Sequence, residues 1–263
     1  MAEETSGILV PTKTFEEMKS EFEPLSIVLF CGKDFTSDLI KKVQSKAMEE
    51  KSHVKNYGIY SHCGVLVNKS LFPNIEALDP EKWYVFEMTM SRQVSGDPVP
   101  NAETGKGKFG LQLRDFEKVV AYYNGDVAVL KLKNNPIRKK DSETKEEYWK
   151  RLEQITEKSK QFKKDNDSIN YQMNPFRLLA SVFSEIRWLR TFMPFTDPWQ
   201  MCSEITTSYL KAVGAFDSSI NEENVVPQDF IFDEDQALKQ TLFELPPIRI
   251  EKPPKTKIEI MPH

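Results

Sequence analysis

The sequence predicts an α+β protein with an antiparallel sheet, because its β-rich segments gather in the first half of the chain and its long helical patterns in the second. The β-rich segments lie between residues 26 and 133, and the longest helical patterns come after residue 144. Strands that alternated regularly with helices would instead indicate a parallel sheet.

The chain opens with a charged lead-in, a strand and a helix. Residues 1–25 are predicted to form the lead-in, with one short helix over Thr14–Phe22. The compact apolar run SIVLFCG at Ser26–Gly32 ends at a glycine and predicts a buried strand. In residues 34–50 apolar side chains recur at helical spacing, so a helix is expected there.

The next elements are three strands, a loop and a short helix. Gly58–Asn68 and Lys82–Ser91 are rich in aromatic and β-branched residues, which favours strands. Prolines and glycines between Val94 and Gly110 predict a loop. A short helix over Arg114–Gly125 and a strand over Asp126–Lys133 are expected to follow.

The second half of the chain is mainly helical. Lys145–Phe162 carries one apolar stripe surrounded by charges, which predicts an amphipathic helix. Asn174–Phe195 predicts a second helix that is apolar around more than half its girth, with Pro175 in its first turn. Residues 245–263 contain two proline pairs and several lysines, so they are predicted to be extended or disordered.

Length and charge narrow the class of protein. The 263 residues suit one domain with extensions or two small domains, and a net charge of −4 gives no general electrostatic reason to bind nucleic acid. The acidic N-terminus has no apolar signal-peptide core, and no stretch reaches the ~20 apolar residues of a membrane span. We therefore expect a cytoplasmic protein, or one packaged from the cytoplasm.

The cysteines and histidines limit the metal and redox chemistry that is expected. Three cysteines, Cys31, Cys63 and Cys202, are an odd and small number, which argues against a disulfide framework and for a reducing compartment. The sequence has no Cys-x-x-Cys pair and no His-Glu-x-x-His run. Neither a metal site nor a cofactor is therefore expected.

Cys202 is the first candidate for chemistry because it lies near the start of a predicted helix. Asp197 and Pro198 precede it as the expected cap and first-turn proline, and Gly214 is expected to end the helix. Unpaired N–H groups at a helix N-terminus stabilise a thiolate and an oxyanion. Free cysteine is also a good core residue. From this segment alone, nucleophile and core residue are equal interpretations of Cys202.

A thiolate nucleophile needs a base, and His62 is the best candidate because it lies within a predicted strand. His53 lies in a polar segment bordered by lysines, and His263 is the last residue. Strand alternation places His62 and Gly64 on one face and Cys63 on the other. Cys63 is therefore a poor partner for His62, while Gly64 leaves room for another element to approach. A histidine satisfied within the core is the common alternative.

Glu87 is the candidate third residue, because it is a carboxylate inside the otherwise apolar run WYVFEMTM. Burying an unpaired charge costs several kcal/mol, so such a residue normally has a partner. That partner is His62 on a neighbouring strand, or a lysine or arginine, unless this face is solvated. A nucleophile, a histidine and a carboxylate together match the requirements of nucleophilic catalysis.

Six segments of the chain resemble the circularly permuted, papain-like branch of the NlpC superfamily, which occurs in bacteria and in large DNA viruses such as poxviruses. Two of them are SIVLFCGKDFTSDLIKKVQ and LQLRDFEKVVAYYNGDVAVLKLK, and the other four include the most specific motifs. In chain order these four are YSHCGVLV, YVFEMT, MCSEITTSYLKAVG and NEENVVPQDF. In unpermuted relatives the cysteine precedes the histidine, whereas here His62 comes first and Cys202 last. The resemblance covers residues 26–230, with a helical insertion at about 140–195. Residues 1–25 and 231–263 are then terminal extensions.

This resemblance implies a papain-like fold in which the cysteine helix packs on a small antiparallel sheet or barrel. It implies Cys202 as nucleophile, His62 as general base and Glu87 as the third residue of a thiol hydrolase. Peptide, amide or lipid-like acyl compounds are the implied substrates. If the source is viral, packaging in the virion is expected.

The sequence departs from the family pattern in three places. Leu25 and Ser26 stand before the first strand where a Gly-Asp pair is frequent, and Cys63 replaces an aliphatic residue, which adds a second thiol near the site. The helical insertion is also longer than a minimal member needs. Residues 174–195 are interpreted as a helix buried on two sides, or as an apolar wall that accepts an acyl chain or contacts a membrane peripherally.

Two further functions stay open beside an amidase or peptidase. One is an acyltransferase or lipid hydrolase that uses the same three residues, which only the apolar insertion favours. The other is a non-catalytic scaffold or virion protein that retains the fold. The presence of Cys202, His62 and Glu87 together argues against a scaffold.

Overall fold

The computed structural model describes residues 10–33, 60–89, 99–108, 110–168, 170–171, 199–200, 202–225, 227–231, 238 and 242–253. The helix expected at residues 34–50, the helix expected at 174–195, and His53 and His263 lie outside these residues. No helix in the described part of the chain is both long and apolar enough to cross a membrane.

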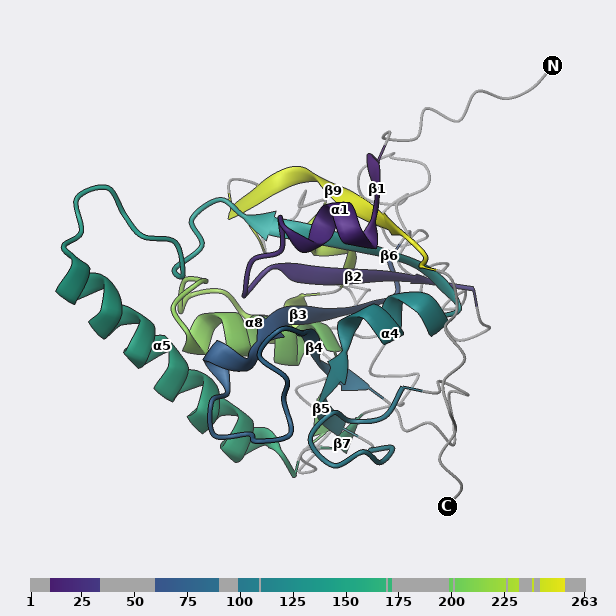
Figure 1. Ribbon diagram of the computed structural model, residues 1–263, viewed down its shortest axis with the longest axis horizontal. Coiled ribbons are helices and arrows are strands. Elements are labelled where there is room, and N and C mark those ends of the chain that lie inside the picture. Colours follow the sequence, from purple (N-terminus) through teal and green to yellow (C-terminus); the bar gives the residue numbers. More distant parts are fainter. Residues whose placement is uncertain are drawn as a thin grey trace.

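A seven-stranded sheet forms the centre of the described fold, and its strand order is β1-β9-β6-β2-β3-β4-β5 (Figure 1). All neighbouring strands are antiparallel except β1 and β9, which pair in parallel. The predicted α+β class is confirmed, while the parallel pair makes the sheet mixed. The strands are β1 (Thr12–Thr14), β2 (Ile27–Gly32), β3 (His62–Asn68), β4 (Trp83–Thr89), β5 (Gly110–Asp115), β6 (Gly125–Leu132) and β9 (Phe243–Glu251).

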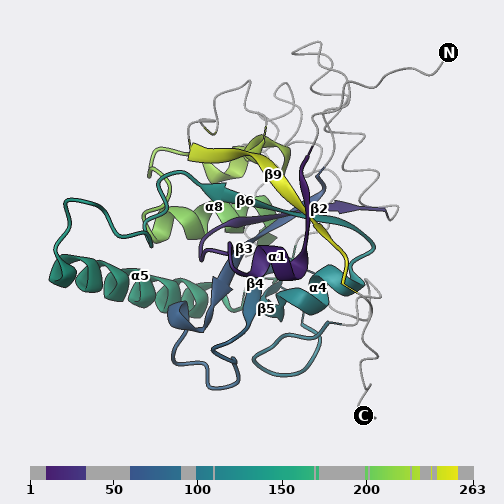
Figure 2. The same cartoon turned by 45° about the horizontal axis from the view of Figure 1, so that its top comes forward.

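Helices cover both faces of this sheet (Figures 1 and 2). Helices α8 (Cys202–Ala212) and α5 (Lys145–Asn166) lie on one face, and α1 (Phe15–Lys19) and α4 (Phe116–Tyr122) lie on the other. A two-stranded pair, β7 (Asn170–Tyr171) and β8 (Trp199–Gln200), is separate from the main sheet. Short 3₁₀ turns complete the described elements: η1 (Lys69–Leu71), η3 (Glu222–Asn224) and η4 (Pro227–Phe230).

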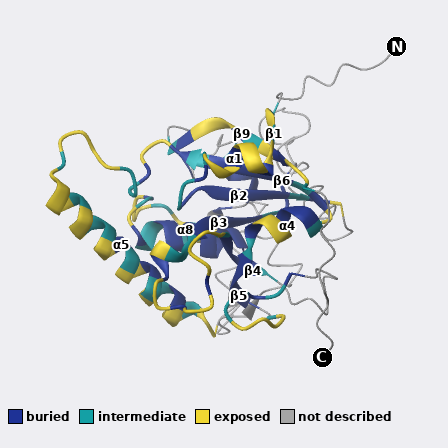
Figure 3. Ribbon diagram, in the orientation of Figure 1, coloured by how far each residue is buried: buried dark blue, intermediate teal, exposed yellow. Residues whose placement is uncertain are grey.

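The central strands of the sheet are largely buried (Figure 3), and alternation along them divides the core into two clusters. In β3, Cys63, Val65 and Val67 belong to the cluster that packs against α8, whereas Leu66 belongs to the cluster that packs against α1 and α4. The period of two in a strand produces this division. The two faces of β3 predicted from the sequence are therefore confirmed.

The first helix is shorter at both ends in the structure than the sequence predicted. The structure places α1 at Phe15–Lys19 rather than Thr14–Phe22. Thr14 is its N-cap, since its hydroxyl accepts a hydrogen bond from the Glu17 backbone N–H while the Glu17 side chain accepts from the Thr14 N–H. This capping box satisfies two of the helix's exposed donors and fixes its start.

The structure adds a strand that the sequence analysis missed. Gly110–Asp115 forms β5, with Leu111 and Leu113 in the core and Gln112 and Arg114 on the opposite face. The helix expected from Arg114 therefore begins later, at Phe116, where Asp115 caps it by accepting a hydrogen bond from Lys118 N–H.

The C-terminal segment is also more regular than predicted. Phe243–Glu251 forms β9, which lies between β6 and β1. A register shift between Val129 and Lys131 of β6 accommodates the stretch that contains Pro246 and Pro247. Prolines lack the N–H that a regular ladder needs, so an irregular register is the expected way for this segment to pair.

Candidate active site

The helix that carries Cys202 starts at that residue. Helix α8 spans Cys202–Ala212, so the first N–H groups of the helix surround Cys202 and have no partner within the helix. The prediction that Asp197 caps this helix was wrong, because Trp199 and Gln200 form strand β8 between Asp197 and the helix. Asp197 and Pro198 themselves lie outside the described residues.

The end of α8 follows the sequence prediction. Gly214 has a φ of +79°, and its N–H donates to the carbonyl of Lys211. The N–H groups of Ala215 and Phe216 both donate to the carbonyl of Leu210. This left-handed glycine termination satisfies carbonyl groups that the helix leaves free, and it explains why Gly214 is suited to the position.

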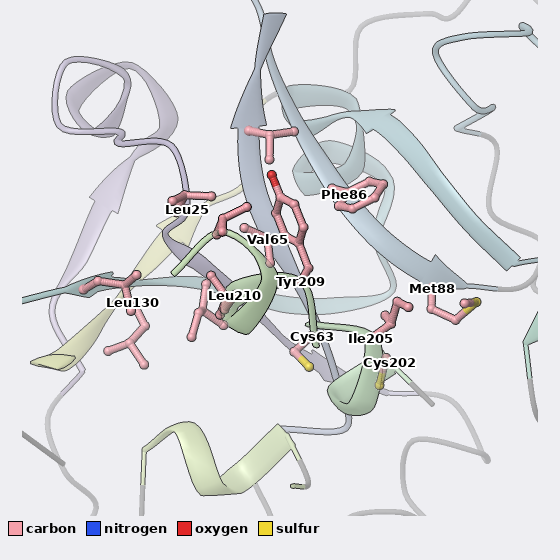
Figure 4. Close-up of a cluster of buried hydrophobic side chains, with 14 of the residues drawn as sticks. Leu25, Cys63, Val65, Phe86, Met88, Leu130, Cys202, Ile205, Tyr209 and Leu210 are labelled. Atoms are coloured by element: carbon pink, nitrogen blue, oxygen red, sulfur yellow. The ribbon is translucent and has the colours of Figure 1, made fainter. Parts of the chain in front are cut away.

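Helix α8 is held against the sheet by an almost wholly buried surface. Ile205, Tyr209 and Val213 lie in the core cluster, and the Tyr209 hydroxyl is 2.8 Å from the Ser159 hydroxyl of α5. Cys202 belongs to the same cluster and is 2% exposed (Figure 4). The first turn of α8 therefore has a fixed position over β3 and β4.

His62 is the first residue of β3, and the residues before it are anchored on two sides. The Ser61 N–H donates to the Phe30 carbonyl, and the Ser61 hydroxyl accepts from the Gly32 N–H of β2. The Tyr60 N–H donates to the side-chain oxygen of Gln228, which is buried in η4. These bonds fix the end of the strand from which the imidazole projects.

Glu87 lies beside His62 and is completely buried. Its Oε2 atom is 2.5 Å from Nε2 of His62, and its Oε1 atom accepts a hydrogen bond of 2.7 Å from Nε of Arg114. Of the partners left open by the sequence, the structure therefore gives Glu87 both a histidine and an arginine. The carboxylate is shared between a ring that it orients and a cation that balances its charge.

Arg114 is the member of this group that sequence reasoning missed. It is 3% exposed and lies on β5, opposite Val85 of β4, on the same face as Glu87. The signal was present in LQLRD, where two polar residues alternate with two leucines. That alternation is typical of a strand with two polar side chains on one face, but the sequence prediction ended a loop at Gly110 and began a helix at Arg114.

Gly64 provides the space that the Glu87 side chain occupies. A Cβ atom at Gly64 would lie 2.8 Å from Glu87 Cβ and 2.8 Å from Val85 Cγ2, and 3.0 Å from the carbonyl oxygen of Phe86. The prediction that this glycine permits a close approach is confirmed. The element that approaches is the neighbouring strand β4, which brings Glu87 to His62.

The Cys202 sulfur meets His62 at the end of β3. In the described part of the sheet, the ladder between β3 and β4 covers Val65–Asn68 and stops short of His62. The Cys202 thiol interacts with the His62 ring, with the Cys63 thiol and with the Cys63 backbone N–H. Because Nε2 of His62 is bonded to Glu87, Nδ1 is the ring atom left to exchange a proton with sulfur.

These contacts favour a thiolate and an imidazolium. A hydrogen bond with the neighbouring Cys63 thiol lowers the pKa of Cys202 well below its ordinary value. Burial opposes this shift, and the charge of His62 adds to it. Burial alone would lower the pKa of His62, but the Cys202 thiolate and the Glu87 carboxylate outweigh burial and raise it to about 10. Burial would raise the pKa of Glu87, yet Arg114 and His62 together lower it. Cys202, His62, Glu87 and Arg114 therefore form a series in which each charged group interacts with one of opposite charge.

The three sequence-predicted site residues are thus brought together, whereas His53 and His263 lie outside the described residues. Cys31 is half-buried on β2, and Cys31, Cys63 and Cys202 are not joined by disulfides. No protein-family model matches the chain, and no curated protein matches it either. The chemistry of the site is therefore argued from its geometry.

Proposed function

We propose that the protein is a thiol-dependent hydrolase that cleaves an amide bond, of the peptide or N-acyl type, with Cys202 as nucleophile. The observation that carries the proposal is the 2.5 Å contact of His62 with the buried Glu87, supported by the interaction of the same ring with the Cys202 thiol. A buried cysteine that served packing alone would need neither an adjacent imidazole nor a buried carboxylate behind that imidazole. The papain-like, circularly permuted arrangement belongs to the same proposal, since His62 and Glu87 precede Cys202 in the chain.

In the acylation step, the Cys202 thiolate attacks the carbonyl carbon of the substrate and the carbonyl oxygen becomes an oxyanion. The backbone N–H groups in the first turn of α8, which do not bond within the helix, are the donors proposed to stabilise that oxyanion. The His62 imidazolium then protonates the leaving amine, the C–N bond breaks, and a thioester to Cys202 remains.

In the deacylation step, neutral His62 accepts a proton from water while the water oxygen attacks the thioester carbonyl. The C–S bond breaks, the acid leaves, and sulfur returns to the thiolate paired with imidazolium. Glu87 keeps the ring in one orientation and stabilises its charged form, and Arg114 holds Glu87 in place. Arg114 is therefore a positioning residue.

The experiment is labelling with a panel of peptidyl and N-acyl acyloxymethyl ketones, followed by mass mapping of the adduct. We expect the adduct on Cys202, its loss in Cys202→Ala, weaker labelling in His62→Ala and unchanged labelling in the control Cys31→Ser. An adduct that forms on Cys31, or labelling of Cys202 that is indifferent to His62, would overturn the proposal. For a probe that binds, the matching amide substrate in isotopically labelled water separates hydrolysis from transfer, because only hydrolysis places water oxygen in the released acid.

A further inference from the structure

A second thiol, Cys63, lies next to the proposed nucleophile. Cys63 is fully buried on β3, on the strand face that packs against α8 rather than the face of His62 and Gly64. It belongs to the same core cluster as Cys202 (Figure 4). Strand alternation places Cys63 and His62 on opposite faces of β3. In the structure the Cys63 side chain lies on the face that packs against α8.

The position of the Cys63 sulfur is fixed by a second contact with α8. Cys63 Sγ donates a hydrogen bond of 3.7 Å to the hydroxyl of Thr206. Thr206 lies four residues after Cys202, and residues at this spacing occupy the same face of a helix. The Cys63 sulfur is therefore beneath the first turn of α8, where its thiol interacts with that of Cys202.

We propose that Cys63 acts as a resolving cysteine: when a hydroperoxide oxidises Cys202, Cys63 captures it as a reversible intramolecular disulfide that switches the site off. The effect on catalysis rests on the proposed function. The disulfide itself rests on the placement of the two sulfurs beside the first turn of α8, and it would require an S–S bond of about 2.05 Å.

The two steps balance without a further cofactor. The Cys202 thiolate attacks one oxygen of the hydroperoxide, an S–O bond forms, the O–O bond breaks, and hydroxide or alkoxide leaves. Sulfur is oxidised by two electrons to a sulfenic acid, and the peroxide is reduced. Cys63 then attacks the Cys202 sulfur, the S–S bond forms, the S–O bond breaks, and the hydroxyl departs with the Cys63 proton as water.

The charges of the site set the order of these steps. Burial, together with the neighbouring Cys202 thiolate, raises the pKa of Cys63 well above its ordinary value, so Cys63 is the protonated thiol of the pair. Cys202 is consequently the sulfur that reacts first with peroxide. Oxidation removes the negative charge from Cys202, which removes its repulsion of a Cys63 thiolate, and Cys63 then becomes the attacking group.

A resolving thiol also protects the nucleophile. A sulfenic acid that is not captured proceeds with more peroxide to sulfinic and sulfonic acids, which ordinary thiol reductants do not restore. Capture by Cys63 keeps Cys202 at the disulfide level, from which a dithiol returns both sulfurs to thiols.

The test treats the full chain with hydrogen peroxide, blocks free thiols, and maps the peptides by mass before and after reduction with dithiothreitol. In the native sequence we expect a linked Cys63–Cys202 peptide whose mass is lower by about 2 Da than the sum of the two reduced peptides. In Cys63→Ala we expect sulfinic acid on Cys202 that reductant does not reverse. Cys31→Ser is the matched control and should give the same link as the native sequence.

The outcomes separate this inference from the proposed function. Sulfinic acid on Cys202 in the native sequence at the lowest effective peroxide dose, or a link that joins Cys31, would overturn the resolving role even if the hydrolase is active. A Cys63–Cys202 link would support the resolving role even if no amide is cleaved. Mapping of the native sequence decides the question by itself if Cys63→Ala does not fold.

Discussion

Two groups of charged side chains in this molecule differ in how far solvent reaches them. Glu87 is fully buried between His62 and Arg114, and the Arg114 side chain is 4% exposed. Arg138 pairs with Glu23 and Glu244 at 2.7 Å, yet 36% of its side chain is exposed. Both groups join one carboxylate or more to an arginine with similar geometry, so burial is the main difference between them.

Burial decides what such pairs cost. An exposed ion pair contributes about 0–1 kcal/mol and loses little when it is broken. A buried pair has given up hydration worth several kcal/mol per ion, and apolar side chains of similar size often serve stability as well or better. The buried group therefore has its most direct explanation in chemistry at Cys202, whereas the Arg138 group needs no function beyond the surface.

The largest expected effect is on activity. Cys202→Ala removes the proposed nucleophile, so hydrolysis of an amide substrate identified by the probe panel should fall by roughly 10⁴-fold or more. The measurement is kcat/KM, with Cys31→Ser as the control that retains a full rate. Turnover that survives Cys202→Ala would show that His62, Glu87 and Arg114 do not support catalysis by Cys202.

The next effect is on stability. Glu87→Ala leaves Arg114 as a buried charge without its carboxylate, so the free energy of unfolding should fall by about 3–5 kcal/mol. Urea denaturation measures this loss. A loss no greater than that of Arg138→Ala would mean that the two charged groups contribute equally to stability, and burial would then not be the difference that matters.

A smaller loss is expected from Gly64→Ala, which tests the packing that brings Glu87 to His62. The added Cβ would meet two atoms at 2.8 Å, so the strands must shift, at a cost of about 1–3 kcal/mol. Gly105→Ala is the matched control, because nothing lies within 4 Å of its Cβ and only its φ of +67° is unfavourable. Gly64→Ala should also slow labelling of Cys202, while Gly105→Ala should leave labelling unchanged.

The smallest effect is expected at the surface. Arg138→Ala should lower the free energy of unfolding by less than about 1 kcal/mol, with the loss diminishing as salt is added. Labelling of Cys202 should be the same as in the native sequence. A change in labelling would mean that the exposed Arg138 group influences the site around Cys202, which would contradict the proposed difference between the exposed and the buried group.

The sequence predicted much of the site because each residue carried its own local signal. Cys202 followed a helix-start pattern, His62 lay in a strand with a glycine two residues later, and Glu87 interrupted an apolar run. The His62 signal has its cause in strand alternation and the Glu87 signal in the cost of an unpaired buried charge. The helix does start at Cys202, although the cap predicted at Asp197 was wrong. The proximity of the three residues in space was suggested by a family resemblance rather than by the patterns.

Arg114 and strand β9 were harder to predict because their structure depends on distant partners. Glycines and prolines precede the short alternation that contains Arg114, and a strand of that length is stabilised by β4 rather than by its own propensity. The C-terminal prolines argued against a strand, yet Phe243–Glu251 pairs with β6 through an irregular register. Pairing between segments more than a hundred residues apart leaves no local signal.

The pH dependence of Cys202 alkylation tests the central claim most directly. The pKa of Cys202 is lowered, so its thiolate persists as pH falls below the ordinary thiol pKa of about 8.5. The pKa of His62 is raised to about 10, so the imidazolium persists as pH rises toward that value and is lost above it. The charged partners of His62 stabilise the folded state fully below the ordinary histidine pKa of about 6.5. This stabilisation is lost as the pH rises through about 10.

Because Cys202 is 2% exposed, the midpoint of the pH curve, rather than the absolute rate with iodoacetamide, reports its thiolate. We predict a midpoint for Cys202 well below 8.5 in the native sequence, and a shift of that midpoint upward in His62→Ala, with Cys31 as the internal reference. A midpoint for Cys202 that equals that of Cys31 and does not respond to His62→Ala would contradict the account.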